Sequence, residues 1–478
     1  MPLPPPPDHE DLDPRDWPDA RAQAHRMLDD LFDHLERLRE GPVWRPIPEQ
    51  VRQAVRQPLP RRPTPLAQVH EEFMRLVLPY SVGNLHPGFM GWVHGGGNVA
   101  GMLGEMLAAG LNANLGGRDQ MPVELERQIL RWLAPLFGMS GQAGGLFVTG
   151  SSMANFMAVL VARSAALGSE VRNKGLACAR RQLAGYASTA VHGCVVRAME
   201  MAGMGSEALR LVPVDGEGRM DLAALAAAVA GDRSAGRQPF LVVGTAGTVD
   251  TGAVDDLEGI ADLAAEHRLW FHVDGAYGAL ALLAPALAPR LAGIRRADSV
   301  ALDFHKWGQV PYDAGYFLAR DGELQRRTFA SEAAYLRRSD RGLAAGTPWP
   351  CDLGPDLSRG FRALKVWFTL KVHGTDRLGE IIGHTCELAR YLQDRVLQEP
   401  RLELLAPAHL NIVCFRLRGD DSGRRSAEAV TRLHESGLAA PSTTVLGGRL
   451  AIRAAIVNHR TQPRDIDRLL DALLPDLA

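Results

Sequence analysis

Residues 241–307 contain three short apolar runs that each end in a polar residue: Leu241-Val242-Val243-Gly244-Thr245, Leu269-Trp270-Phe271-His272-Val273-Asp274 and Ser299-Val300-Ala301-Leu302-Asp303. The three end residues lie 29 positions apart each time. Between the first two runs, Leu257, Ile260, Ala261 and Ala264 keep helical spacing. Strand, helix and strand at this pitch predict βαβ units in a mostly parallel sheet. Because ligands of such sheets bind beyond the carboxyl ends of the strands, we expect the polar end residues at a functional site.

The regions on either side of this sheet predict smaller units. Towards the N-terminus, an apolar stripe from Met27 to Leu38 predicts an amphipathic helix, and a second helical stretch covers about Leu66–Leu78. Towards the C-terminus, helical stretches alternate with the strands Asn411–Leu417 and Leu450–Ala455, as in a small α+β domain. We therefore expect a helical arm that packs in a dimer (1–85), a large α/β domain (86–365) and a small C-terminal domain (366–478).

The composition excludes several classes of function. The 478 residues include 53 Lys and Arg against 55 Asp and Glu, a formal net charge of −2, so no basic surface for nucleic acid is expected. The five cysteines are far apart and form no C-x-x-C pair, which predicts neither a disulfide framework nor a metal site. The start of the chain is rich in proline and then acidic, unlike a signal peptide. We expect a soluble, cytoplasmic protein that acts on small molecules.

Two further motifs place chemistry at the same edge of the sheet. Lys306 follows the third strand in Asp303-Phe304-His305-Lys306-Trp307, where a desolvated amine is a nucleophile. The apolar run Leu146–Val148 breaks at Gly150-Ser151-Ser152 and restarts as a helix, whose free N–H groups and hydroxyls can bind an anion. Taken singly, such a lysine is more typical of a surface loop, and such a turn of a plain helix cap. Their combination with Asp274 is what carries the prediction.

An anion site, an acidic strand end and a lysine on one sheet edge together predict a site for pyridoxal 5′-phosphate. Gly150, Ser151 and Ser152 are expected to hold the phosphate. Asp274 is expected to pair with the protonated pyridine nitrogen, and Lys306 to form the Schiff base. The small residues after Asp274 let a flat ligand lie close to the backbone.

A family resemblance is carried by six parts of the sequence in order and spacing: Thr149–Asn155, His192, Thr245–Asp256, His272–Tyr277, Asp303–Trp307 and Leu450–His459. In these the chain resembles the group II pyridoxal-phosphate-dependent amino-acid decarboxylases, which include aromatic amino-acid, histidine and glutamate decarboxylases. The resemblance extends from about Pro87 to the C-terminus. It implies the aspartate aminotransferase-like fold (fold type I), a homodimer with shared active sites, and conversion of an L-amino acid to the amine and CO2.

The resemblance also implies roles for single residues. His192 matches the histidine that stacks on the cofactor ring, and its 82-residue spacing from Asp274 favours that role over a core histidine. Ala276 matches the small residue on the opposite ring face, and His305 the histidine beside the lysine, near the substrate carboxylate. Arg359 matches an arginine near the substrate, although a solvated arginine at a helix start is the alternative.

The chain departs from the family pattern at two cofactor positions. Asp303 stands where many relatives have an asparagine that binds the phosphate, and a carboxylate there repels phosphate unless it is compensated. The usual Gly-Thr-Thr reads Gly247-Thr248-Val249, which leaves Thr248 as the hydroxyl expected near the cofactor.

A third departure concerns the proton that must return to the α-carbon after CO2 leaves. Relatives deliver it from a tyrosine in a mobile loop, whereas the matching residues 336–358 contain no tyrosine and have Pro350 at its place. Either another donor acts, with His192 and Tyr335 as candidates, or the reaction differs. The alternatives are a decarboxylation-dependent aldehyde synthase, a pyridoxal-phosphate-dependent carbon–carbon lyase, and a cofactor-binding protein without turnover.

The substrate side is less specific. Trp92, Val93 and His94 align with the family segment that lines the side-chain pocket. Arg118 could meet an acidic substrate, although an ion pair at a dimer interface is the alternative. The choice between aromatic and polar amino acids stays open at this point.

Overall fold

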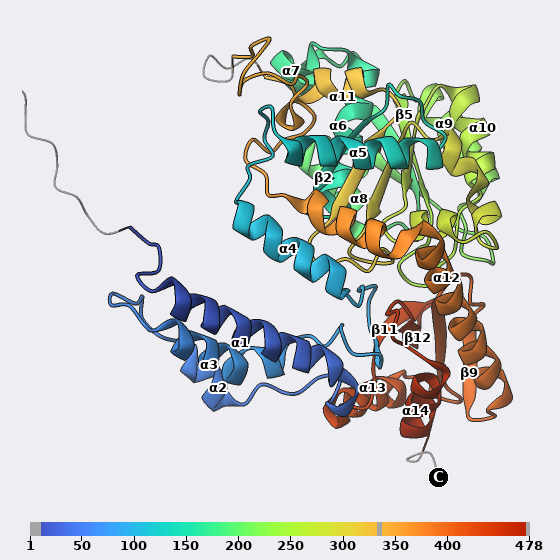
Figure 1. Ribbon diagram of the computed structural model, residues 1–478. Coiled ribbons are helices and arrows are strands. Elements are labelled where there is room, and N and C mark those ends of the chain that lie inside the picture. Colours follow the sequence, from blue (N-terminus) through green and yellow to red (C-terminus); the bar gives the residue numbers. More distant parts are fainter. Residues whose placement is uncertain (1–10, 332–336, 475–478) are drawn as a thin grey trace, which may run out of the picture. The chain divides into compact units, whose positions relative to one another are not determined.

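The computed structural model describes residues 11–331 and 337–474 of the chain (Figure 1). The chain divides into two compact units, Met1–Gly83 and Asn84–Ala478. In the residues that the structure describes, no helix is both long and apolar enough to cross a membrane.

The N-terminal unit consists of helices α1 (Trp17–Glu36), α2 (Glu49–Ala54) and α3 (Leu66–Leu76), with 3-10 turns at Leu38–Glu40 and Leu78–Tyr80. Helix α1 begins after Asp16, whose carboxylate accepts the N–H of Asp19. Buried His70 of α3 joins the two long helices, since its ring contacts Gln23 and Asp30 of α1. Both predicted helices are confirmed.

The large sheet of the second unit has seven strands in the order β2-β8-β7-β6-β5-β3-β4. Only β8 is antiparallel to its neighbours, so the predicted mostly parallel sheet is confirmed. Three strands end at the predicted residues, and Thr245 and Asp274 are direct partners in the sheet. The strands are β2 (Gly144–Val148), β3 (Leu183–Ser188), β4 (Leu209–Val212), β5 (Gln238–Thr245), β6 (Trp270–Asp274), β7 (Ser299–Asp303) and β8 (Gly315–Ala319).

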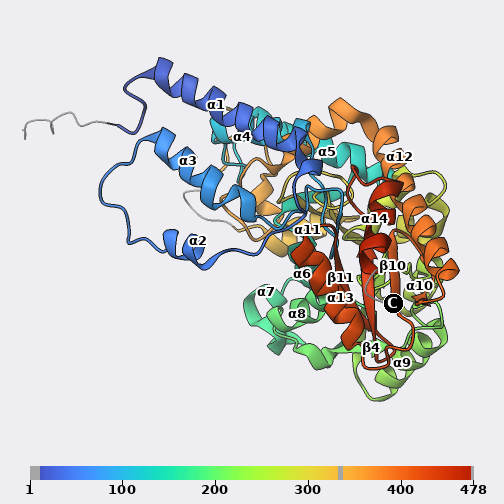
Figure 2. The same cartoon turned by 90° about the horizontal axis from the view of Figure 1, so that it is seen from below.

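Helices cover both faces of this sheet (Figures 1 and 2). Alternate residues of β5 point to opposite faces: Leu241 and Val243 pack with α8, whereas Val242 packs with α10. Burial on both faces explains why the strands are continuous apolar runs. The helices are α4 (Val99–Leu111), α5 (Met121–Leu136), α6 (Ser151–Leu167), α7 (Val171–Lys174), α8 (Gly193–Met201), α9 (Leu222–Ser234), α10 (Leu257–His267) and α11 (Gly322–Phe329).

Helix α12 (Arg362–Gln398) connects the large sheet to the C-terminal sheet (Figure 1). Its interior contains Gly374 in a left-handed conformation (φ 73°), which kinks the helix between the two predicted helical stretches. The C-terminal sheet has the order β1-β11-β12-β10-β9, flanked by α13 (Arg424–Ser436) and α14 (Pro463–Leu473). Its strands are β1 (Phe89–Met90), β9 (Leu402–Ala406), β10 (Ile412–Leu417), β11 (Ala440–Leu446) and β12 (Arg449–Ala455).

Strand β1 belongs to the C-terminal sheet, although it precedes the large sheet in the sequence. Phe89 and Met90 pair in parallel with Ala440 and Pro441 of β11, although the expected boundary assigns them to the large domain. The chain therefore passes through the C-terminal sheet before it enters α4. Residues 91–97 consequently run between the two sheets, and Gly95 donates its N–H to the carbonyl of His305.

Candidate active site

The carboxyl ends of β2, β6 and β7 bring the predicted site residues together. Ser151 begins α6 just after β2, and its N–H donates to Oδ1 of Asp303 at the end of β7 over 2.7 Å. The N–H of Asp303 in turn donates to the carbonyl of Ala276, two residues after Asp274. Residues 152 positions apart in sequence thus lie in hydrogen-bonding contact, as the parallel-sheet prediction requires.

Asp303 is the centre of this arrangement. Its side chain is 2% exposed, and Oδ2 accepts the Ser151 hydroxyl at 2.8 Å and the Lys306 Nζ at 2.8 Å. Burial raises the pKa of this carboxyl, but the charge of Lys306 and the hydrogen bonds from Lys306 and Ser151 outweigh it, so its pKa lies below the ordinary value. The carboxylate is therefore ionised at neutral pH and holds three donors.

His305 faces the same carboxylate as a neutral ring. Burial lowers its pKa to about 4. Nδ1 accepts the N–H of Ala314 at 3.0 Å, so the proton of the neutral imidazole lies on Nε2, 3.7 Å from Oδ2 of Asp303. The hydrogen bond from Ala314 holds the imidazole beside Lys306, and the neutral imidazole adds no charge to the site.

Asp274 lies deeper and is poorly compensated. One oxygen accepts the N–H of Ala276 at 3.1 Å, and among the described residues no cation forms an ion pair with it. Burial raises its pKa, opposed by the charge of Lys306, the Ala276 N–H, the charge of His192 and the side chain of Asn155. Such a carboxylate is the kind of group that a protonated ring nitrogen would stabilise.

Unpaired buried hydroxyls surround the same edge. Ser188 ends β3 and Thr245 ends β5, and their hydroxyl oxygens have no hydrogen-bond partner within the part of the chain that the structure describes. Buried polar atoms without partners are costly and point to a missing ligand. Together with the poorly compensated Asp274 and the amine of Lys306, they fit a cofactor that combines a phosphate, a ring nitrogen and an aldehyde.

The remaining predicted cofactor residues are placed differently. His192 caps α8, accepts the Cys194 N–H on Nδ1 at 3.2 Å, and stays exposed, so its ring is free to cover a flat ligand. Ala276 is half-buried beside Asp274. Thr248 is buried, and its hydroxyl is already bonded to the Thr251 hydroxyl and to the Ala253 N–H. The hydroxyl of Thr248 is thus used within its own turn.

The predicted pocket segment forms a row of aromatic rings next to Lys306. Phe89, Trp92 and His94 stack on one another, and His94 meets the edge of Tyr312 at 5.8 Å. The Tyr312 ring packs on His305 at 4.2 Å. Val93 instead points into the hydrophobic core and is 7% exposed, which makes it a packing residue in this chain.

Gly95 allows the segment that carries these aromatic rings to lie against the backbone of His305 and Lys306. A Cβ atom at Gly95 would lie 2.4 Å from the carbonyl oxygens of His305 and Lys306, so only glycine allows the two backbones to touch. Buried Arg453 fixes the other end of the row, because its guanidinium donates to the carbonyls of Trp92 and Val249. Trp92 itself is 55% exposed.

The structure corrects the predicted substrate contact of Arg359. The side chain is fully buried and forms a two-pronged ion pair with Glu126, at 3.0 and 2.6 Å. It also donates to the carbonyls of Leu115 and Phe147. The alternative of a solvated arginine at a helix start is wrong as well, since α12 begins at Arg362. Arg359 is a structural residue behind β2.

Residues 337–353 include the place at which the family resemblance predicts a loop tyrosine, and here Ala345, Trp349 and Pro350 are buried. Trp349 is 1% exposed, donates its indole N–H to Ala345, and lies between the guanidinium groups of Arg118 and Arg338. Pro350 is buried in the 3-10 turn Pro350–Asp352. Arg118 thus contacts the Trp349 ring within the chain, and its predicted substrate or interface contact stays a prediction. Tyr335, the predicted alternative donor, lies outside the described residues.

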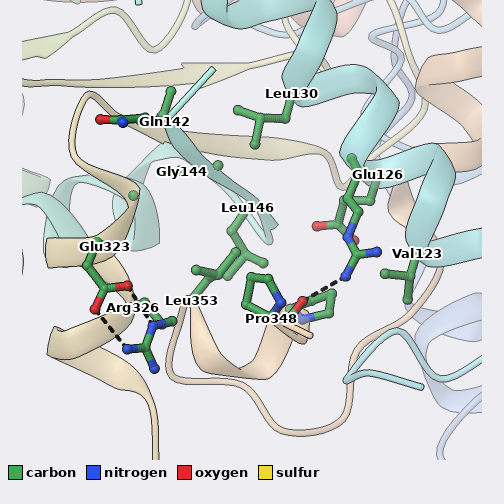
Figure 3. Close-up of a pocket in the computed structure, with 15 residues that line it drawn as sticks. Val123, Glu126, Leu130, Gln142, Gly144, Leu146, Glu323, Arg326, Pro348 and Leu353 are labelled. Carbon is green, nitrogen blue, oxygen red and sulfur yellow. Dashed lines mark hydrogen bonds and ion pairs between the residues drawn. The ribbon is translucent and has the colours of Figure 1, made fainter. Parts of the chain in front are cut away.

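A cavity of about 260 Å³ opens at the other end of β2, beside Gly144 and Leu146 (Figure 3). As far as the described residues go, its lining contains none of the predicted cofactor residues. Of its charged groups, Glu323 and Arg326 pair with each other (Figure 3), and Glu126 is paired with Arg359 outside the lining. The cavity is therefore distinct from the site around Lys306.

Sequence reasoning missed several residues that the fold adds. Tyr312 carries no motif signal, because it reaches the site only through the loop after Lys306. Asn155 and His272 form a buried pair at 2.8 Å behind the cofactor edge. Burial lowers the pKa of His272 to about 3, so it is neutral. His272 itself was the available sequence signal, because it lies two residues before Asp274 and therefore on the same face of the predicted strand.

The fold and this edge define an α/β enzyme of the aspartate aminotransferase-like type that uses pyridoxal phosphate. Residues 48–418 match the pyridoxal-dependent decarboxylase conserved domain, and the chain belongs to that family. Aromatic-L-amino-acid decarboxylase of Bacillus atrophaeus is 31% identical over 463 residues, covering 95% of this chain and 94% of that protein. Phenylacetaldehyde synthase of Arabidopsis thaliana is 28% identical over 474 residues, covering 95% of each.

Solved structures agree with this family. The crystal structure of Oryza sativa TDC with PLP and tryptamine superimposes with a TM-score of 0.89 at 26% identity, covering 97% of this chain and 98% of that one. The predicted fold class, cofactor and enzyme class, a pyridoxal-phosphate-dependent carboxy-lyase, are thus confirmed.

Proposed function

We propose that this decarboxylase holds its cofactor through Lys306, Asp274 and the N-terminus of α6, and that it converts an aromatic L-amino acid to the amine and CO2. The observation that carries the proposal is the Lys306 amine, 20% exposed at the carboxyl edge of the sheet, beside the N–H groups that begin α6. When bound there, pyridoxal phosphate supplies the electron sink for loss of CO2 from the α-carbon.

The chain's own residues have separable tasks in this proposal. The N–H groups of Ser151 and Ser152 hold the phosphate, helped by the positive end of the α6 dipole. Asp274 would keep a proton on the pyridine nitrogen of the cofactor, and the exposed imidazole of His192 would cover one face of the pyridine ring. His305, neutral and fixed by Ala314, orients the substrate carboxylate through its Nε2–H.

The aromatic row supports the choice of substrate class. Phe89, Trp92, His94 and Tyr312 offer ring faces and edges beside Lys306. Burial and the charge of Lys306 lower the pKa of His94, so this side chain is neutral and adds no charge to attract an acidic substrate. Aromatic side chains prefer such surroundings.

Tyr312 is the donor we propose for the proton that returns to the α-carbon. Its ring lies on His305, and burial together with the charge of Asp303 raises the pKa of its phenol, so it keeps its proton at neutral pH. Among the described residues, no group accepts a hydrogen bond from its hydroxyl and competes for that proton. His192 remains a second candidate.

The alternative reaction couples decarboxylation to oxidation by O2, which with water gives an aldehyde, ammonia and hydrogen peroxide besides CO2, and one observation favours it. The described part of the stretch that carries the loop tyrosine in relatives, residues 337–358, has none and is packed around Trp349. Tyr312→Phe separates the two reactions. We expect the wild-type enzyme to release amine and CO2 in equal amounts, and the variant to lose amine and gain aldehyde. Aldehyde, ammonia and peroxide from the wild type would instead establish the alternative.

Borohydride reduction tests the cofactor site directly. The sequence contains only four lysines, at positions 174, 306, 365 and 371. We expect the loaded protein to show a yellow absorption band that borohydride abolishes, and peptide mapping to find the cofactor on Lys306. A label on Lys365 or on either of the other two lysines would refute the proposed site.

We further propose a cytoplasmic homodimer with shared active sites, in which the helical arm of residues 1–85 packs on the partner. The apolar side chains Met106, Leu107 and Leu111 of α4 are exposed in the single chain, which supports a covering partner. Sedimentation of an active monomer would contradict this.

A further inference from the structure

The anion site at the start of α6 is already bound by a carboxylate of the chain itself. Helix α6 has Gly150 at its N-cap, which offers no side chain to accept the first N–H groups. Asp303 takes this role from the neighbouring strand: its two oxygens accept the N–H and the hydroxyl of Ser151 at 2.7 and 2.8 Å. These are the donors that we assign to the cofactor phosphate.

The same carboxylate also binds the amine that the cofactor needs. Lys306 Nζ lies 2.8 Å from Oδ2 of Asp303. An ammonium held by a carboxylate is not a nucleophile until it gives up its proton. One buried side chain, 2% exposed, thus engages both the phosphate donor and the reactive lysine.

The local charges do not remove the conflict with a phosphate. Lys306 is the one cation in contact with Asp303 among the described residues, and the other contacts are the neutral His305 ring and the Ser151 hydroxyl. A phosphate brought to the same donors adds about two negative charges. At about 4 Å two unit charges still interact by several times the thermal energy near a protein surface.

We propose that Asp303 is the chain's own competitor for the cofactor phosphate: it occupies the Ser151 donors and the Lys306 amine in the cofactor-free protein and releases both when the cofactor loads. The inference rests on the proposed cofactor site. An asparagine, as in the relatives that the sequence resembles, has no charge to repel the phosphate and can donate to it through its amide. Asp303 thereby sets how tightly this chain holds its cofactor.

The test measures binding to the cofactor-free protein by calorimetry, with inorganic phosphate and with pyridoxal phosphate as separate ligands. For Asp303→Asn we expect the affinity for inorganic phosphate to rise at least about tenfold, equivalent to about 1.4 kcal/mol. The affinity for pyridoxal phosphate should rise as well. Asp303→Ser gives the same comparison if the asparagine variant does not fold.

Two control variants separate competition from a structural role. Asp298 lies just before β7, at its opposite end, and also binds a backbone N–H, that of Phe271 at 2.8 Å, so Asp298→Asn should leave phosphate affinity unchanged. Ser151→Ala removes one phosphate donor and should weaken phosphate binding. If instead Asp303→Asn weakens phosphate binding, or leaves it unchanged, the carboxylate only organises the turn and the competition is refuted.

Failure of the cofactor site gives a different result. If Ser151→Ala and Asp303→Asn both leave the affinity for pyridoxal phosphate unchanged, the phosphate does not bind at α6. The competition is then refuted together with the proposed site. If Ser151→Ala weakens cofactor binding and Asp303→Asn also weakens it, the site stands and the competition alone fails.

Discussion

Two buried ion pairs lie near the end of β2, and they differ in how completely they are enclosed. Arg359 and Glu126 are 0% and 5% exposed; the terminal guanidinium nitrogens also donate to the carbonyls of Leu115 and Phe147, and Glu126 accepts the Phe147 N–H. Lys306 and Asp303 are 20% and 2% exposed, and the lysine has Asp303 as its one ion-pair partner among the described residues.

The difference separates a structural pair from a reactive one. A fully enclosed pair holds its surroundings together, and removing one partner leaves an unpaired buried charge. A pair that is open on one side can exchange its partner for a ligand. The family motif predicts chemistry for Lys306, and the enclosure of Arg359 explains why its family match does not make it a substrate ligand here.

Replacement of Lys306, the lysine of the partly exposed ion pair with Asp303, is expected to have the largest effect. Lys306→Met should abolish the cofactor band and reduce kcat by at least about 10³-fold, because no other lysine lies at the carboxyl edge among the described residues. Lys365→Met is the matched control: Lys365 is also buried and ion-paired, 2.9 Å from Glu105. An unchanged band in the Lys306 variant would contradict the comparison.

Breaking the enclosed pair should affect stability and spare the chemistry. Arg359→Met is expected to lower the free energy of unfolding by about 3–5 kcal/mol, since Glu126 is left buried without its partner. Denaturant titration measures the change. The double variant with Glu126→Gln should recover most of it, and the folded fraction of either variant should bind cofactor normally. A specific loss of substrate affinity would return Arg359 to the active site.

Replacement of Asp274 should have opposite effects on the stability of the cofactor-free protein and on cofactor binding. Because burial raises its pKa, the folded cofactor-free protein loses stability as the pH rises from about 3.9 through the pKa in the folded state. Asp274→Asn should therefore stabilise the cofactor-free protein at neutral pH by about 1–3 kcal/mol, with the difference vanishing in acid. The same variant should bind cofactor more weakly. Thermal melts of both proteins from acid to neutral pH check the first part, and a destabilised variant at neutral pH would refute it.

The smallest effect is expected at the cation–π contact of Arg118, which is partly exposed to solvent. Arg118 lies 4.4 Å from the centre of the Trp349 ring. Arg118→Gln should cost about 0.5–1 kcal/mol of stability through loss of this cation–π contact. Substrate specificity should not change. A shift of preference between acidic and aromatic substrates would show that Arg118 contacts the substrate after all.

Local patterns predicted the centre of the large sheet, and they missed β3, β4 and β8. The ends of β5, β6 and β7 at Thr245, Asp274 and Asp303 follow from apolar runs with a constant spacing, because both faces of these strands are buried. The turn between β2 and α6 follows from glycine and serine after an apolar run. In the C-terminal sheet β9 and β11 were missed, since β9 is only partly buried and the second half of β11 is partly exposed. Their alternation is weak.

The candidate site was predictable where chemistry follows a strand end, and not where distant segments meet. Ser151, Asp274, Lys306 and their order are legible from the sequence. The contact of Tyr312 with His305 depends on the path of the loop after Lys306, and the enclosure of Arg359 depends on α5. Neither position carries a periodic signal, because each contact joins segments with no fixed spacing.

The sequence by itself determined the class of protein: a parallel sheet with an anion turn, an acidic strand end and a lysine at one edge, in the order of a pyridoxal-dependent decarboxylase. These features are local, so the residues that form them are neighbours in the chain. Only the tertiary structure decided that Asp303 binds both Ser151 and Lys306, and that Arg359 serves the core. Partnerships of charged groups are set by burial and by distances across the fold, which residue spacing does not encode.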